Sequence, residues 1–279
     1  MSGEGEQESY GRAQRGGDAV LRRRELEWLA RAGLVARGVV YATIGILAVK
    51  LAVGSGGHAT NQTGALKTIA HQPLGEALLI ATALGLAGYS LWRLTRAIVG
   101  HGTEEKDSAL DRVAGLASGI AYGGLCLTAV KILTGASTKG ATNNPKGSTG
   151  DVLSWTLGPE LVGVAGLILI GVGLYQGYKG LSREFMKTSH TEQMSPAVTR
   201  AFTALGVFGH LARMVVFALA GYGLVKAALD HNKRNAIGLD GALNKLAHAS
   251  YGPLLLGLVA VGLIGFALYS IADARYRRV

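Results

Sequence analysis

Ala36-Arg37-Gly38-Val39-Val40-Tyr41 opens an apolar stretch that ends at Lys50, and the same pattern returns twice along the chain. The second copy occupies residues 117–122 (ASGIAY) and the third occupies residues 212–217 (ARMVVF). A lysine follows each copy at the same distance, so the three align without a gap. Self-similarity at a fixed spacing indicates that one structural unit was copied. We therefore expect a fold built from three equivalent units.

A second block completes each unit. Residues 64–71 (GALKTIAH) reappear as residues 241–248 (GALNKLAH), and a decayed version stands at 150–154. A glycine then opens a long apolar run that closes with an aromatic residue. The glycines are Gly75, Gly158 and Gly252, and the aromatic residues are Trp92, Tyr175 and Tyr269. The unit therefore predicts a helix, an outer loop ending in a short amphipathic helix, and a second helix.

Composition places these units in a membrane. Charged residues make up 16% of the 279 residues and apolar ones 49%. Six apolar runs are each about long enough to cross a bilayer. They are residues 34–53, 74–94, 116–133, 161–178, 205–229 and 254–271. We predict an all-α integral membrane protein, a six-transmembrane-helix bundle of three tandem helical-hairpin repeats with pseudo-threefold symmetry.

The predicted organisation has a tail followed by three repeats. Residues 1–27 are polar and lack the apolar core of a signal peptide, so they are expected to form a disordered basic tail in the cytoplasm. Two transmembrane helices are expected in each of the repeats 28–100, 108–187 and 197–279.

The net charge of +10 gives a topology rather than a nucleic-acid partner. Most of the 28 Lys and Arg residues lie before the first span, between the repeats, or at the C-terminus. By the positive-inside rule these segments and both termini are cytoplasmic. Contact of the basic segments with anionic lipids is a secondary expectation.

Two arginines are candidate ligand-binding residues. Arg37 and Arg213 take the same place in the first and third repeats, where the second has Ser118. The first expectation is that they extend to the headgroups at the membrane surface. The alternative is that they point inward, towards a lipid phosphate or a substrate anion. Tyr41 shares the face of Arg37, and His210 lies one turn before Arg213 on the same path.

Charged residues at the outer ends of the spans are predicted to be interfacial. Lys50, Lys131 and Lys226 close the first helix of each repeat. Glu76 and Glu160 open the second helix in the first two repeats, where an acid suits the positive helix end. We expect the lysines to anchor at the interface, with ion pairs to these glutamates as the alternative.

His71 and His248 occupy equivalent places before the second helix of their repeats. A pair of histidines there suits a metal ion or a quinone carbonyl, but no carboxylate or cysteine completes a metal set at recognisable spacing. We expect ordinary loop histidines that bind the backbone, and no metal or cofactor. Cys126, the single cysteine, excludes a disulfide within the chain.

Glycine is abundant, with 42 residues, and is spaced for helix packing. Gly115, Gly119 and Gly123 share one helix face, as do Gly173 and Gly177. Small residues let helices pack closely in lipid, so we expect a tight bundle without a wide pore. Catalytic motifs such as the P-loop and the zinc-protease pattern are absent from the sequence, and we expect no enzymatic activity.

The chain resembles an uncharacterised bacterial membrane family, the domain of unknown function 1206. The resemblance is carried by the Ala-Arg-Gly-Val-Val-Tyr motif that occurs three times, the Gly-Ala-Leu segment and the closing aromatic residues. The resemblance covers roughly residues 28–276, and the second repeat departs most from it. It implies a six-helix protein of the bacterial inner membrane and implies no biochemical activity.

Three functions stay open from the sequence. The first is a non-enzymatic scaffold or accessory subunit that binds lipid, a membrane protein complex or another copy of itself through its glycine faces and outer cap. The second is a transporter or channel for an anion or amphiphile, lined by Arg37, Arg213 and His210. The third is a quinone-associated redox accessory protein that uses His71 and His248. Polar faces that point into the bundle favour transport, and the same residues facing lipid favour the scaffold.

Overall fold

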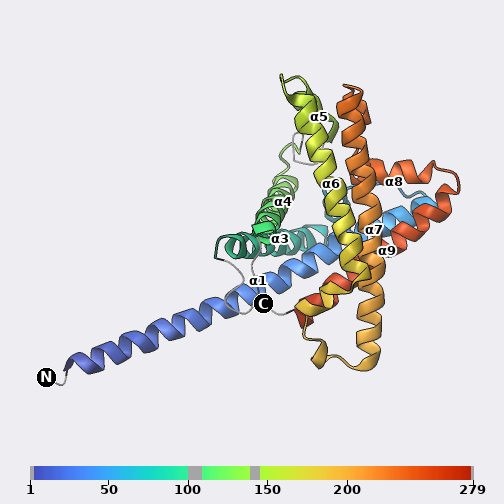
Figure 1. The fold of residues 1–279 in the computed structure, drawn as a ribbon. Coiled ribbons are helices and arrows are strands. Elements are labelled where there is room, and N and C mark those ends of the chain that lie inside the picture. The colour runs from blue at the N-terminus through green and yellow to red at the C-terminus, as the bar shows by residue number, and fades with distance from the viewer. Residues whose placement is uncertain (1–2, 100–108, 139–144, 278–279) are drawn as a thin grey trace.

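Six long helices confirm the predicted class of fold (Figure 1). The computed structural model describes residues 3–99, 109–138 and 145–277. The long helices are α1 (Gly3–Ala52), α3 (Gly75–Val99), α4 (Ala109–Leu133), α6 (Gly158–Leu181), α7 (Pro196–Leu229) and α9 (Gly252–Tyr276). Each contains a segment that is long and apolar enough to cross a membrane. The chain is therefore a multi-pass membrane protein.

A short helix precedes the second long helix of each repeat, as the sequence predicts. These helices are α2 (Gln62–Ala70), α5 (Pro145–Leu153) and α8 (Leu239–Ala247). The glycine after each is required because a Cβ at Gly75, Gly158 or Gly252 would collide with a carbonyl oxygen at the end of the short helix. We call the side of the bundle that carries α2, α5 and α8 the loop end, and the opposite side the basic end.

Three 3-10 turns occur in the connecting segments. They are η1 (Glu184–Thr188), η2 (Thr191–Gln193) and η3 (Lys233–Asn235). The first two lie between α6 and α7 at the basic end, and η3 packs against α5 and α7 at the loop end.

The N-terminal segment differs from the prediction. Residues 1–27 were expected to be disordered, but α1 continues back to Gly3 without interruption. The segment contains no proline, and extending a helix that already exists needs no new nucleation. The polar composition therefore does not end the helix.

The long helices form a ring in which each repeat packs against the next. α3 packs on α4, α6 on α7, and α9 on α1, so each repeat meets the next in the order expected for a pseudo-threefold bundle. At each of these interfaces a glycine on one helix makes room for a larger side chain of the neighbouring helix. The pairs are Gly119 with Leu94, Gly177 with Met214, and Gly38 with Ile271.

The ring is open at one place. α1 packs on α3 and α7 on α9 within the first and third repeats, but α4 and α6 of the second repeat share no packed interface over the described residues. We call this place the α4–α6 break. At the loop end α5 packs against α6 and η3, whereas α2 packs against α4. The short helices therefore lie on opposite sides of the break as well.

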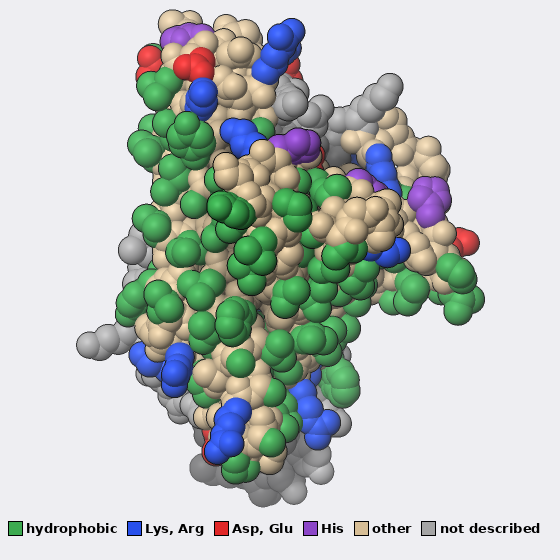
Figure 2. All heavy atoms as spheres, turned by 90° about the vertical axis from the view of Figure 1, so that its right-hand side faces the viewer, with side chains coloured by type: hydrophobic (Ala, Val, Ile, Leu, Met, Phe, Trp, Pro, Cys, Tyr) green, Lys and Arg blue, Asp and Glu red, His purple; other side chains and the backbone are tan. Residues whose placement is uncertain are grey.

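The exterior of the bundle has the pattern of a membrane protein (Figure 2). Hydrophobic side chains cover the middle of the visible face, Lys and Arg gather towards its two ends, and His lies towards the upper end. The main core lies between α1, α7 and α9 and includes Ile44, Val216 and Leu263. In the apolar windows of α1 and α9 56% of residues are buried, against 17% for α4 and 22% for α6, so the second repeat is the peripheral one.

Candidate functional site

Arg37 lies inside the bundle, bound by side chains of two other helices. α1 and α9 approach closely there, because Gly38 leaves room for Ile271. Arg37 is 8% exposed, its Nε donates to Ser270 Oγ at 2.9 Å, and its Nη1 donates to the Tyr89 hydroxyl at 3.3 Å. The expectation that Arg37 extends to the headgroups is therefore wrong, because partners on α3 and α9 hold its guanidinium inside.

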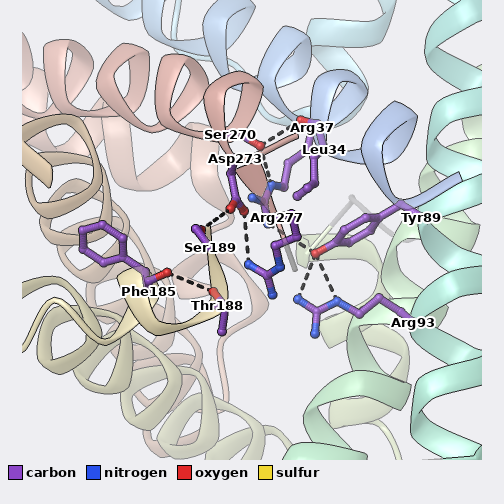
Figure 3. Close-up of polar contacts among 10 residues, drawn as sticks. All are labelled: Leu34, Arg37, Tyr89, Arg93, Phe185, Thr188, Ser189, Ser270, Asp273 and Arg277. Carbon is purple, nitrogen blue, oxygen red and sulfur yellow. Dashed lines mark hydrogen bonds and ion pairs between the residues drawn. The ribbon is translucent and has the colours of Figure 1, made fainter. Parts of the chain in front are cut away.

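Tyr89 also binds a second arginine (Figure 3). Arg93, one turn further along α3, donates to the same hydroxyl from Nε at 3.0 Å and from Nη2 at 2.9 Å. The guanidiniums of Arg37 and Arg93 lie 5.6 and 5.3 Å from the centroid of the Tyr89 ring. The phenolic oxygen therefore accepts from two cationic side chains.

Arg213 is the counterpart of Arg37 in the third repeat and also points inward. Its Nη1 and Nη2 lie 3.0 and 2.9 Å from the side-chain oxygen of Gln176 on α6, in the amide orientation that accepts both. The rings of Tyr41 and Phe217 flank the guanidinium at 5.4 and 5.1 Å. Its Nε is buried without an acceptor in the part of the chain that the structure describes.

Phe266 lies between the two inward-pointing arginines. Its centroid is 5.0 Å from the guanidinium of Arg37 and 4.4 Å from that of Arg213. A desolvated contact of this kind is worth about 2 kcal/mol, because the face of the ring is electronegative. It offsets only part of the cost of burying two positive charges, and an anion offsets more. Tyr41 packs edge-on against the same ring at 4.9 Å.

Among the described residues, Asp273 supplies the buried negative charge at this site. Asp273, near the end of α9, is fully buried and accepts from Ser189 Oγ at 2.9 Å and from Arg277 Nη1 at 3.1 Å. A backbone bond from His190 to Tyr276 ties the same segment to the end of α9. Burial lowers the pKa of Arg277, but Asp273 and neighbouring tyrosines raise it by more, so the pKa lies above its ordinary value and the side chain is charged.

Lys179 contributes a further positive charge from α6. It interacts electrostatically with Arg277, Arg93 and Arg37, which come from three other parts of the ring. We call the set Arg37, Arg93, Lys179, Arg213 and Arg277 the cationic cluster. Asp273 is the carboxylate that acts on Arg37 and Arg277. Unbalanced positive charge away from water is unfavourable unless an anion neutralises it.

His210 lies beside the cationic cluster but is held in an aromatic wall. It is buried, and its Nδ1 donates to the Gly206 carbonyl at 2.7 Å. Its ring stacks on Phe185 with centroids 5.1 Å apart and meets Tyr269 edge-on at 5.4 Å. The structure therefore places His210 near Arg213, as the sequence suggests, with a ring that is fixed by packing.

The two loop histidines are not part of this site. His71 and His248 directly follow α2 and α8 at the loop end, and both are exposed. The Nδ1 atom of His248 lies 2.9 Å from the Asn244 carbonyl oxygen, which is the ordinary backbone bond expected for it. Among the described residues no three His, Cys, Asp or Glu side chains are grouped to hold a metal ion.

The predicted interfacial residues also lie outside the cationic cluster. Lys50, Lys131 and Lys226 are exposed in the last turns of α1, α4 and α7, and Glu76 and Glu160 are exposed in the first turns of α3 and α6. The ion pairs found among the described residues do not join these lysines to these glutamates. Interfacial anchoring stays the prediction for them.

Sequence reasoning missed most of the cationic cluster. It counted Arg93, Lys179 and Arg277 as topology charges only. A usable signal was present, because Arg93, Gln176 and Ser270 each directly follow the closing aromatic residue of their repeat. The structure places these three equivalent residues against Tyr89 and the two inward-pointing arginines. Guanidinium, ammonium and phenol donors in one place suit the oxygens of a phosphate or carboxylate.

Comparison with known proteins agrees with the repeat structure. The family described as Domain of Unknown Function (DUF1206) matches three regions of the chain, residues 32–100, 113–183 and 208–277. The chain is similar to the uncharacterized protein YxxB of Bacillus subtilis (strain 168), with 31% identity over 252 residues that cover 89% of this chain and 90% of that relative. No solved structure matches the chain. With three tandem matches and this relative, the chain belongs to the DUF1206 family.

Proposed function

We propose that this protein is a non-enzymatic membrane protein that binds the anionic headgroup of a lipid in its cationic cluster. The observation that carries the proposal is that five cationic side chains, Arg37 buried and the other four half-buried, lie within electrostatic reach of one another, with Asp273 as the buried carboxylate among the described residues. Ionisable residues inside a membrane bundle are costly, and they usually mark a binding site or path. A phosphate group would neutralise the excess charge and accept from the free Nε of Arg213.

The scaffold form of this proposal no longer rests on glycine faces. Gly119 and Gly123 of α4 pack against Leu94 and Ser90 of α3, and Gly177 of α6 packs against α7. Those faces are used within the chain, which removes them as docking surfaces for a partner or a second copy. Lipid binding therefore becomes the favoured part of the scaffold hypothesis, and a protein complex has no specific surface in its support.

We further propose that the basic end faces the cytoplasm and that the membrane is the bacterial inner membrane. Arg31, Arg93, Arg200 and Arg275 all belong to the basic end, and positive charge is retained on the cytoplasmic side. The proposal predicts that, in a chain carrying Cys126→Ser, a single cysteine placed at Lys187 is labelled by an impermeant maleimide only after the cells are opened. Labelling of intact cells would reverse the orientation.

Substitution of Lys179 tests the binding site directly. Lys179→Gln removes one cation without adding bulk, and the loss of one charged hydrogen bond should weaken binding of phosphatidylglycerol about tenfold. The measurement is native mass spectrometry of the purified protein with added lipid. Lys226→Gln, the same change at the loop end, is the matched control and should leave binding unchanged. Equal affinities for the two variants would refute the proposed site.

Transport of an anion or amphiphile is the second candidate. It is favoured because Arg37, Arg213 and His210 all point into the bundle and away from lipid. Arg37→Ala combined with Arg213→Ala should abolish flux of a fluorescent phosphatidylglycerol across proteoliposomes that contain the native protein. If the native protein shows no flux, the transport hypothesis is excluded and only the binding proposal is retained. The quinone hypothesis has no comparable support, because His71 and His248 are exposed ends of short helices.

A further inference from the structure

The opening of the second hairpin follows from its sequence. Within the first and third repeats the helices cross at Gly85 and Gly262, where a Cβ would approach Ala36 and Ala212 to 2.7 and 2.6 Å. The equivalent residue of the second repeat is Ile168. An isoleucine at this crossing cannot occupy the space that the two glycines leave, so α4 and α6 do not close as the other hairpins do.

A second crossing position changes in the same way. Gly33 of the first repeat packs directly against Tyr89, and Gly209 of the third repeat packs directly against the equivalent Phe266. In the second repeat alanine replaces the glycine at position 114, and Val172 replaces the aromatic residue. The contact that closes a hairpin near the basic end is therefore missing from the second repeat on both helices.

The surfaces left uncovered are apolar. Ile168 and Val172 on α6 are 62% and 41% exposed, whereas their equivalents in the other two repeats are buried. Ala117 is also exposed, whereas its equivalents in the other two repeats are buried. Positions that the closed hairpins bury are thus available to hydrocarbon chains at the α4–α6 break.

The basic end of the break is polar and cationic. α6 brings Gln176 and Lys179 to the cationic cluster, and α4 brings Tyr122, whose ring meets Tyr89 edge-on at 4.6 Å. Further towards the loop end, α6 exposes the apolar residues Ile168 and Val172. A positive end followed by exposed apolar residues matches a phospholipid of the leaflet at that end, with its headgroup at Lys179 and its chains towards the bilayer centre.

We propose that the α4–α6 break is a lateral entrance that holds the acyl chains of an anionic phospholipid while the cationic cluster holds its headgroup. The inference rests on the proposed function, and it adds the class of ligand and the route by which it arrives. The lipid moves sideways from the leaflet between α4 and α6, so its chains stay in an apolar environment throughout. Neither passage through the loop end nor separation of the other five helix pairs is needed.

A bulky substitution in the break separates this inference from headgroup binding. Ile168→Trp fills the break, whereas Leu167→Trp adds the same bulk to an equally exposed neighbour, also 62% exposed, whose side chain points about 100° away. Both variants are compared by native mass spectrometry with dioleoyl phosphatidylglycerol and with its water-soluble dihexanoyl form. Ile168→Trp should lower the affinity for the long-chain lipid about tenfold, as expected when about two methylenes are withdrawn from contact. The affinity for the short-chain form should not change.

Each outcome decides a different statement. Unchanged long-chain affinity for Ile168→Trp, or an equal loss for Leu167→Trp, would overturn the lateral entrance and leave headgroup binding in place. An equal loss for both lipid forms with Ile168→Trp would also overturn it, because the substitution would then act on the cationic cluster. Failure of the native protein to retain either lipid would contradict the proposed function itself.

Discussion

The hairpin of the third repeat and the hairpin of the second repeat derive from one copied unit but pack differently. α7 and α9 bury Gly209 against Phe266 and Gly262 against Ala212, whereas α4 and α6 are separate over the described residues. The repeats still meet their neighbours through equivalent interfaces all around the ring. The comparison shows that contacts between repeats preserve the ring, and that small residues at two crossing points decide whether a hairpin closes.

The same comparison applies to charge. Asp273 of the third repeat and Lys179 of the second stand at equivalent positions in their helices. Asp273 is fully buried and fastens Ser189 and Arg277, whereas Lys179 adds charge to the cationic cluster. We infer that the closed hairpin uses this position for stability and the open hairpin uses it for binding.

Asp273→Ala should give the largest effect. It leaves the half-buried Arg277 and the buried Ser189 hydroxyl without their acceptor, and breaking a charge pair whose carboxylate is fully buried lowers the free energy of unfolding by about 3–5 kcal/mol. The measurement is unfolding in mixed micelles followed by circular dichroism. Lys179→Gln at the equivalent position should change the unfolding free energy little, so similar losses for the two variants would remove the distinction between the hairpins.

Gly85→Ile should give the next largest effect. It copies the second-repeat residue into the first repeat, where even a Cβ alone would lie 2.7 Å from the Ala36 side chain and 2.8 Å from the Ala32 carbonyl oxygen. Overpacking of this kind lowers the free energy of unfolding by about 3 kcal/mol. Ile168→Val in the second repeat is the control, with a change below about 0.5 kcal/mol expected at an exposed site. A cysteine pair between α1 and α3 should also crosslink less efficiently in Gly85→Ile.

Ser118→Arg should give the smallest effect. It restores to the second repeat the arginine found in the other two, and it adds a cation near Tyr122. Each basic residue near an anionic lipid adds about 1 kcal/mol of attraction, so phosphatidylglycerol should bind roughly fivefold more tightly. Ser118→Gln is the neutral control of comparable length. Weaker binding by Ser118→Arg, measured at several salt concentrations, would show that the cluster is not short of an anion.

Some features of the molecule were determined by sequence alone. Local patterns predicted the repeats, the helices and the family correctly. These patterns are the threefold repeated motif around Arg37, the glycine before each second helix and the lengths of the apolar runs. Local patterns suffice for these features, because a membrane requires each span to satisfy its own backbone hydrogen bonds within the helix.

Only the tertiary structure decided where Arg37 points, that Arg93, Lys179 and Arg277 converge on it, and that the ring is open between α4 and α6. An arginine near the end of a span has two acceptable positions, and its neighbours on other helices choose between them. The open hairpin likewise depends on how Ile168 fits a partner helix, which becomes visible only when the three equivalent crossings are compared in space. Packing between distant segments settles these features, because the energies that distinguish the alternatives arise at helix contacts and not along the chain.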